Sequence, residues 1–172
     1  MASIIRLASS ALRGIITLTL LTSSFLSADV SAQHPTGGYA SHCIITGASL
    51  HEGHWLGCNC LNDDVAIFGY NYTWLDLNFC VGNRNGALES YDSGNYTTTC
   101  RNCRIFNNFR TIFLNCLCPD MAHVLHNSTL DLNTTLYDVD GCAGCYNHMG
   151  NKSSDGPPPS SSNRTLLSDS LV

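Results

Sequence analysis

The sequence predicts a disulfide-linked all-β domain that is built from two tandem repeats of about 55 residues. Residues 74–78 (WLDLN) recur as residues 129–133 (TLDLN), and residues 83–86 (NRNG) recur as residues 138–141 (DVDG), both at an offset of 55. Apolar and polar residues alternate in the segments before these motifs, which indicates strands with one buried face. Ten cysteines, all after residue 42, indicate a disulfide framework.

Residues 1–32 read as a signal peptide. Arg6 and Arg13 precede an apolar run over residues 15–21, and the small residues 30–32 (VSA) suit signal peptidase, so we expect the mature chain to begin near Gln33. An uncleaved anchor is the alternative, but the run is short and rich in Ser and Thr for a membrane span. We therefore expect a secreted, extracellular protein with no stable membrane insertion.

Residues 33–146 form the predicted domain, and its surface carries little charge. Charged residues make up 12% of the chain and the formal net charge is −5. Four basic residues fall inside this segment: Arg84, Arg101, Arg104 and Arg110. A nucleic-acid partner requires a basic patch, so the composition argues against nucleic-acid binding.

The first repeat spans residues 39–95. Leu56, Cys58 and Cys60 are two residues apart and therefore share one face of a strand. The LDLN motif of residues 75–78 predicts a short turn in which Asp76 and Asn78 bond nearby backbone amides. The following Asn85-Gly86 pair tolerates positive φ and predicts a tight hairpin.

The second repeat spans residues 96–146 and follows the same plan. Its buried strand face is formed by Ile112, Leu114, Cys116 and Cys118. Asp131 and Asn133 occupy the turn, and Asp140-Gly141 closes the hairpin. Each repeat therefore supplies strands, a turn and a hairpin.

Residues 147–172 are rich in Pro, Ser and Asn, and we expect a disordered tail; a stalk or a glycosylated spacer is the alternative, functional interpretation. The end is too polar for a lipid-anchor signal. The chain contains six Asn-x-Ser/Thr glycosylation acceptors, which is consistent with passage through a glycosylating secretory route. We expect about half of them to be occupied. These acceptors are Asn71, Asn95, Asn127, Asn133, Asn151 and Asn163.

The order of these motifs resembles the cyanovirin-N homology domain of cyanobacteria, filamentous fungi and ferns. The resemblance rests on the paired cysteines, both LDLN motifs, both hairpin turns and the segment Tyr96-x-x-Thr99-Cys100, and it covers Tyr39 to Cys145. It implies two pseudo-symmetric halves, each with a three-stranded sheet and a β-hairpin, with strands exchanged between the repeats. Founding members of that family bind the α1,2-linked mannose ends of high-mannose glycans without metal.

The resemblance also implies the bridges Cys43–Cys60 and Cys100–Cys118, with loops three residues longer than the family leads us to expect. The other six cysteines allow 15 pairings, and the sequence does not choose among them. They are Cys58, Cys80, Cys103, Cys116, Cys142 and Cys145. Cys58 and Cys116 replace a small buried residue; they are either inert core thiols or, as an oxidising compartment favours, parts of further bridges.

Two polar clusters are candidate carbohydrate sites, because amide and carboxylate groups meet sugar hydroxyls in pairs. Carried over by motif position, the first site gathers Asn83, Asn85, Asn95, Thr98, Thr99 and Asp120. The second gathers Ser41, His42, Asn62, Asp63, Asp138, Val139 and Asp140. Each residue also has a plain reading as a hydrogen-bonded turn residue, and a glycan on Asn95 would crowd the first site.

No catalytic, cofactor or metal site is expected. The His-x-x-His segments at residues 51–54 and 123–126 occupy non-equivalent places and lack a helical pattern, so we interpret them as loop histidines. The Cys-x-x-Cys segments at residues 100–103 and 142–145 are interpreted as secreted disulfides. Asp63-Asp64 reads as a turn and not as a glycosidase acid and base.

Two functions remain. The first is a secreted lectin for mannose-rich oligosaccharides, in which two sites on one rigid body give avidity. The second is a disulfide-rich structural or effector protein with the same fold and no sugar binding. Strand exchange within one chain can also occur between two, so the expected state is a monomer or a domain-swapped dimer.

Overall fold

The computed structural model describes residues 37–63 and 69–158, and these residues form an all-β fold with short helical turns. Three predictions fall outside the described residues: the signal peptide of residues 1–32, the tail from residue 159 onward, and the glycosylation acceptor Asn163. No helix within the described ranges has the length and hydrophobicity needed to span a bilayer.

The first half contains an antiparallel sheet in the order β1-β2-β3-β12. The sheet is preceded by a turn of helix, α1 (Tyr39–His42), and a 3-10 turn, η1 (Ile45–Gly47). Its strands are β1 (Ser49–His51), β2 (Trp55–Leu61), β3 (Tyr70–Asp76) and β12 (Asn151–Lys152). Leu56, Cys58 and Cys60 of β2 are all fully buried, as their alternation predicts.

The second half contains the antiparallel sheet β6-β7-β8, which follows the 3-10 turn η4 (Tyr96–Thr98). Its strands are β6 (Arg101–Asn107), β7 (Ile112–Pro119) and β8 (Leu125–Asp131). The predicted inward residues of β7 are buried, from Ile112 at 1% exposure to Cys118 at 0%. The two sheets therefore repeat one pattern.

Both LDLN motifs form the predicted short turn. These are the 3-10 turns η3 (Leu77–Phe79) and η5 (Leu132–Thr134). The carboxylate of Asp76 accepts from the amide of Asn78 at 2.9 Å, and that of Asp131 accepts from the amide of Asn133 at 2.9 Å. The turns thus begin with a side-chain cap, as expected for Asp before a helical turn.

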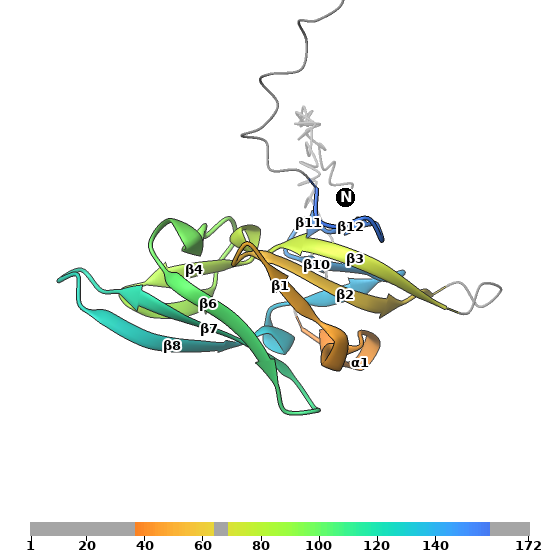
Figure 1. Cartoon of the computed structure of the whole chain (residues 1–172), viewed down its shortest axis with the longest axis horizontal. Helices are drawn as coiled ribbons and strands as arrows, with labels where there is room; N and C mark the ends of the chain where they lie inside the picture. Colours follow the sequence, from red (N-terminus) through yellow and green to blue (C-terminus); the bar gives the residue numbers. More distant parts are fainter. Residues whose placement is uncertain (1–36, 64–68, 159–172) are drawn as a thin grey trace, which may run out of the picture. The chain divides into compact units, whose positions relative to one another are not determined.

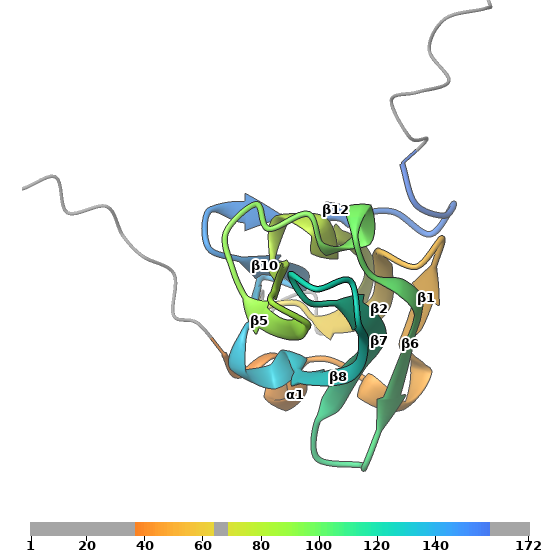
Figure 2. The same cartoon turned by 90° about the vertical axis from the view of Figure 1, so that its left-hand side faces the viewer.

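Each half is completed by the hairpin of the other repeat. Hairpin β4 (Val81–Arg84) to β5 (Ala87–Ser90) packs against β8, and β10 (Cys142–Cys145), paired with β9 (Tyr137–Val139), packs against β3. Figure 1 shows β4 on the side of β6–β8 and β10 on the side of β1–β3, and Figure 2 shows β5 beside β8. The predicted strand exchange is confirmed.

Four disulfides hold the fold. Cys43–Cys60 and Cys100–Cys118, the bridges that the resemblance implies, are both present, and Cys103–Cys116 adds a second bridge inside the second repeat. Cys80–Cys145 joins the first repeat to the second. The expectation of a further bridge is confirmed for Cys116 and wrong for Cys58, which is a buried free thiol, as is Cys142. Thr46 stands where a partner equivalent to Cys103 would be needed.

The prediction of a disordered tail from residue 147 is wrong for its first part. Residues 148–149 form β11 (His148–Met149), which pairs with β10, and β12 pairs with β3. Backbone hydrogen bonds fix this segment, from the Gly150 amide to Ala143 O at 2.8 Å and from the Ser153 amide to Tyr72 O at 3.0 Å. Apart from Met149 and Gly150, residues 147–155 are polar, so their composition gave no sign of the pairing.

Candidate functional site

The first polar cluster forms where the β4–β5 hairpin meets the segments before Cys100 and after Cys118. Asn83 lies at its centre. Its side-chain amide donates to Thr99 Oγ1 at 3.1 Å and to Pro119 O at 2.9 Å, and its Oδ1 accepts from the Gly86 amide at 2.9 Å. Residues from both repeats therefore meet at Asn83, as the motif positions predict.

Asn85 and Asp120 extend this cluster toward the β7–β8 turn. Asn85 Oδ1 accepts from the Met121 amide at 2.9 Å. Asp120 accepts from the amides of Ala122 and Val124, and His126 Nε2 lies 2.8 Å from its second oxygen. The hydrogen bond with His126 is the main cause that holds the pKa of Asp120 below its usual value. The carboxylate is therefore an ionised acceptor at neutral pH.

Asn95 and Thr98 lie on the other side of the hairpin. Asn95 has a left-handed backbone (φ 47°), its amide donates to Asn78 O at 2.8 Å, and its side chain is exposed. Thr98 Oγ1 donates to Asn95 O at 2.8 Å. Asn95 also forms a backbone bridge with Gly82, so it borders the hairpin without sharing the hydrogen bonds of Asn83.

A pocket of about 370 Å³ opens at Asn83, and its other lining residues were not predicted as site residues. Its floor depends on glycine, because a Cβ on Gly94 would lie 2.5 Å from Gly82 Cα. Arg84 and Glu89 form an ion pair of 3.4 Å at its rim, and Tyr91 is 60% exposed. Its lining residues are Gly82, Asn83, Arg84, Glu89, Tyr91 and Gly94.

The second polar cluster forms around the β9–β10 hairpin and centres on Asp138. The side chain of Asp138 is 1% exposed and its Oδ2 lies 4.0 Å from His42 Nδ1. Burial is the main cause, and the Asp63 carboxylate the second, that raise the pKa of Asp138 to about 6. His42 and the Gly141 amide oppose this shift, but neither completes a hydrogen bond with the carboxylate.

Asp63 and Asp140 face each other across the same cluster. The Asp140 amide donates to Asp63 Oδ2 at 2.9 Å, and the Asp63 amide donates to Asp140 Oδ1 at 3.3 Å. Lys152 of β12 forms an ion pair of 3.0 Å with Asp140 Oδ2, and its hydrogen bond is the main cause that lowers the pKa of Asp140. The segment expected as tail thus contributes a cation to this cluster.

The remaining predicted residues lie at the edge of the second cluster. Ser41 is exposed on α1, and its amide donates to Gly38 O at 3.0 Å. Asn62 follows β2, and its amide donates to Gly69 O at 2.9 Å. Val139 pairs with Cys142 in the hairpin. Among these, Ser41 presents a hydroxyl to solvent.

The two clusters have the same frame with different chemistry. Asp138 and His42 stand where the first half has Asn83 and Thr99, because each pair joins the hairpin to the residue before a bridge cysteine. Similarly, the Asp63 amide bonds Asp140 as the Met121 amide bonds Asn85. The first cluster is a neutral hydrogen-bonded network at its centre, whereas the second is charged.

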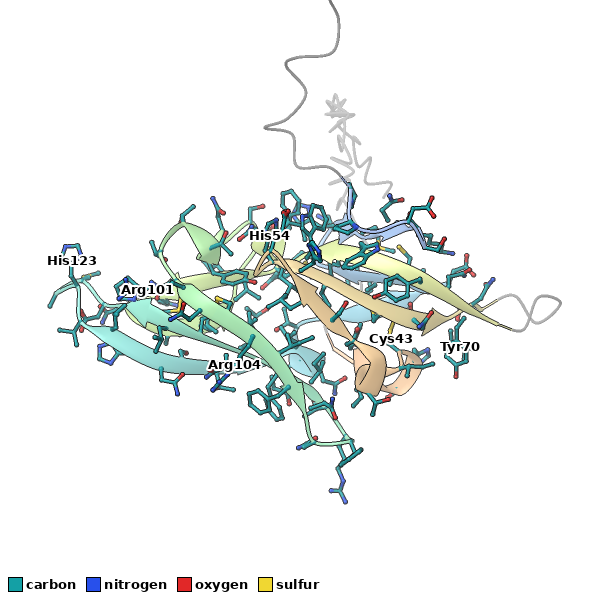
Figure 3. The ribbon with its side chains drawn as sticks, viewed as in Figure 1. Cys43, His54, Tyr70, Arg101, Arg104 and His123 are labelled. Atoms are coloured by element: carbon teal, nitrogen blue, oxygen red, sulfur yellow. A yellow bond between two sulfur atoms is a disulfide. The ribbon has the colours of Figure 1, made fainter. Side chains whose placement is uncertain are left out.

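A second pocket, of about 410 Å³, lies beside the charged cluster. It is formed by β3, β12 and the segment that follows β12, and the expectation of a disordered tail from residue 147 gave no indication of such a pocket. Its lining residues are Tyr70, Asn71, Tyr72, Lys152, Ser153, Ser154 and Asp155. Figure 3 shows Tyr70 at the start of β3, in the same half as Cys43.

The two His-x-x-His segments lie far apart in the structure, and neither Cys-x-x-Cys segment forms an internal disulfide. His54 and His123 lie in different halves (Figure 3), and Arg101 and Arg104 lie on β6. His54 Nδ1 contacts Glu52 O at 3.0 Å, whereas His126 contacts Asp120. The interpretation of the Cys-x-x-Cys segments as disulfide cysteines is confirmed for Cys100, Cys103 and Cys145, which pair with cysteines elsewhere. It is wrong for Cys142, which is a buried free thiol.

The described glycosylation acceptors differ in how free their side chains are. Asn133 Oδ1 accepts from the Ala40 amide at 2.7 Å, and Asn127 Oδ1 accepts from Asn115 Nδ2 at 2.7 Å. Asn71 is partly buried and lines the second pocket, whereas Asn95 and Asn151 are exposed. The Asn133 side chain therefore anchors α1 by a hydrogen bond, whereas Asn95 and Asn151 are exposed to solvent, where a glycan could be attached.

Comparison with known proteins gives one family and several structural neighbours. The family model of the CVNH domain matches residues 39–143. The NMR structure of the Gibberella zeae CVNH protein is 17% identical with a TM-score of 0.54 and covers 63% of this chain and 96% of that chain. No curated protein sequence matches the chain.

Two neighbours were solved with sugars. A MoCVNH3 variant in complex with (N-GlcNAc)4 is 15% identical, with a TM-score of 0.51 and coverage of 63% of this chain and 96% of that chain. The microvirin–mannobiose complex is 21% identical, with a TM-score of 0.50 and coverage of 60% and 94%. At these identities the similarity establishes the shared fold.

Proposed function

Because the chain belongs to the CVNH domain family, we propose that it is a lectin that binds oligosaccharides and catalyses no reaction. Mannose-rich glycans are the first ligand class to test, with GlcNAc oligomers as the second, since relatives of the same fold were solved with mannobiose and with (N-GlcNAc)4. We further propose that the protein is secreted, because its four disulfides require an oxidising compartment.

The observation that carries this proposal is the assembly of each polar cluster from both repeats. Asn83 of the first hairpin meets Thr99 and Pro119 of the second repeat, and Asp138 of the second hairpin meets His42 of the first. Such clusters place amide, hydroxyl and carboxylate groups side by side, which suits sugar hydroxyls that both donate and accept. The exposed ring of Tyr91 beside the first cluster adds an apolar surface for a sugar face.

The test is calorimetric titration of the oxidised full chain with a high-mannose glycan and, separately, with a chitin oligomer. Asn95→Gln is included as a background that removes the acceptor next to the first cluster. Saturable binding that Asn83→Ala or Asp138→Ala weakens by about tenfold or more would support the lectin and locate its sites. Arg110→Ala, in the β6–β7 turn, is the control that should bind like the parent.

A structural or effector protein without sugar binding is the second candidate, and one observation favours it. Asn83 already spends its amide and its carbonyl on three internal hydrogen bonds. A side chain used in this way keeps few groups for a ligand. A flat titration from a folded, fully oxidised sample, repeated with both glycans, would favour this candidate over the lectin.

A further inference from the structure

His42, Asp63 and Asp138 bring together one imidazole and two carboxylates from three distant segments of the chain. His42 ends α1, Asp63 follows β2, and Asp138 lies in β9. One ligand atom from each side chain lies within 4.8 Å of the other two. Imidazole nitrogen and carboxylate oxygen are ligands that Zn²⁺ accepts, and three protein ligands with an open position are typical of its non-structural sites.

Asp138 is the fixed member of this group, and its carboxylate lacks a hydrogen-bond partner among the described residues. Its side chain is 1% exposed, and neither carboxylate oxygen has a hydrogen-bond partner among the described residues. A buried carboxylate is costly unless a cation or a hydrogen bond compensates it. Oδ2 points toward His42 Nδ1 at 4.0 Å, a separation that a bound ion would bridge.

The surrounding charge is also matched to a divalent cation. Asp63, Asp138 and Asp140 bring three carboxylates, and Lys152 brings one ammonium group that is held by Asp140 at 3.0 Å. With all three acids ionised, these four groups sum to a charge of −2, from −3 and +1. Asp140 is neutralised by Lys152, which leaves the carboxylates of Asp63 and Asp138 facing His42.

The other half of the molecule shows that the frame does not require these charges. There Asn83 and Thr99 take the places of Asp138 and His42 and form a direct hydrogen bond of 3.1 Å. Met121 takes the place of Asp63 and keeps the same backbone bond to the hairpin, at 2.9 Å. The charged set is therefore an addition to a frame that folds with neutral side chains.

We propose that the second half binds one divalent transition-metal ion of the zinc class through His42, Asp63 and Asp138, with water completing the coordination. An ion with bonds of about 2.1 Å places tetrahedral ligand atoms about 3.4 Å apart. His42 and Asp63 are exposed and can rotate by the small amount needed, while Asp138 stays in place. Mg²⁺ and Ca²⁺ suit the group poorly because they require six or more oxygen ligands.

The test is calorimetric titration of Zn²⁺ into the full, oxidised chain after chelator treatment and dialysis, with no sugar present. We expect saturable binding of one ion per chain. His42→Gln and Asp138→Asn should each weaken it by at least about tenfold, as loss of a ligand or its support does. Thermal melting of each variant, with all four disulfides verified, separates loss of the ligand set from loss of the fold.

The matched control is His126→Gln, which removes another His–Asp contact. His126 Nε2 lies 2.8 Å from Asp120, closer than His42 to Asp138, but the described residues provide no third ligand there. This variant should bind Zn²⁺ like the parent. No saturable heat from the folded parent, or an equal loss in His126→Gln and His42→Gln, would overturn the proposal. Because no glycan is used, the result does not depend on whether the protein is a lectin.

Discussion

Asp138 and Asn83 are equivalent residues that the fold treats differently. Both lie in the strand just before a hairpin turn, 55 residues apart, and both face the residue before a bridge cysteine. Asn83 is satisfied by three hydrogen bonds, whereas the buried carboxylate of Asp138 has none. With an acid in place of the amide, the position carries a charge when ionised, and burial raises the free energy of that charged form.

Asp138→Asn should stabilise the metal-free protein at pH 7.5 and have little effect near pH 3.5. Burial raises the pKa of Asp138 to about 6 from 3.8, so the folded state holds more protons than the unfolded chain between these values. The contribution of Asp138 to stability therefore falls as pH rises through this window and stays low above it. After a discount for solvent screening, we expect a gain on the order of 1 kcal/mol at pH 7.5.

Urea unfolding in the presence of a chelator, at both pH values, measures this difference. An equal gain at both pH values would instead point to a gain from packing or a new hydrogen bond. A loss at pH 7.5 would show that the ionised carboxylate is compensated in the folded protein.

At the scale of elements, the parts fixed by neighbouring residues were predictable. Asp76 and Asp131 cap the LDLN turns through an amide two residues away, and Asn85 and Asp140 adopt the positive φ that the hairpins need. Each of these features is local, so a short motif contains its cause. The family resemblance, and not the repeats themselves, implied that the hairpins lie beside the segments that flank the bridge cysteines.

Elements that depend on distant partners were not predictable. β12 is polar, and it exists because its backbone completes the edge of the sheet at β3. The pocket lined by Arg84, Glu89 and Tyr91 depends on the close approach of Gly82 and Gly94. The family resemblance did place His42, Asp63 and Asp138 in one candidate site, but their spacing in three separate segments shows no metal-binding motif. Sequence patterns therefore gave the frame of each site but not its full lining.

Gly150→Ala should release the strands that follow the second hairpin. A Cβ at this position would lie 2.6 Å from Trp74 O and 3.0 Å from Ala143 O, both backbone atoms that cannot move aside cheaply. We expect a loss of about 1–3 kcal/mol in the free energy of unfolding. Hydrogen exchange at the Ser153 amide, which donates to Tyr72 O at 3.0 Å, should also become faster.

Gly47→Ala is the control for this substitution. Its Cβ would meet no atom nearer than Ile44 Cγ2 at 3.9 Å, an ordinary contact. Unchanged exchange at Ser153 in Gly150→Ala would show that β12 does not depend on the close packing around Gly150.

At the scale of the whole molecule, strand exchange makes each half depend on both repeats. Leu88 of the first hairpin donates its amide to Ser128 Oγ of β8 at 2.8 Å, and the second hairpin packs against β3. Three of the disulfides found in the described chain stay inside one repeat. Cys80–Cys145 connects the repeats, with a sequence separation of 65. In the oxidised chain this disulfide therefore prevents the two repeats from moving apart.

Replacing both Cys80 and Cys145 by Ala should lower the stability of the protein and allow a domain-swapped dimer. A bridge over 65 residues is expected to contribute about 4 kcal/mol by restricting the unfolded chain. Without it, the repeats can separate while each keeps its own bridges, and two chains can exchange them at high concentration. Light scattering after refolding at increasing protein concentration should show a monomer for the parent and a rising fraction of dimer for the variant.

Removing Cys103 and Cys116 together is the control, because that bridge lies within one repeat and should lower stability without producing the dimer. A dimer that forms equally in both variants would mean that exchange is limited by stability alone, and not by the connection between the repeats.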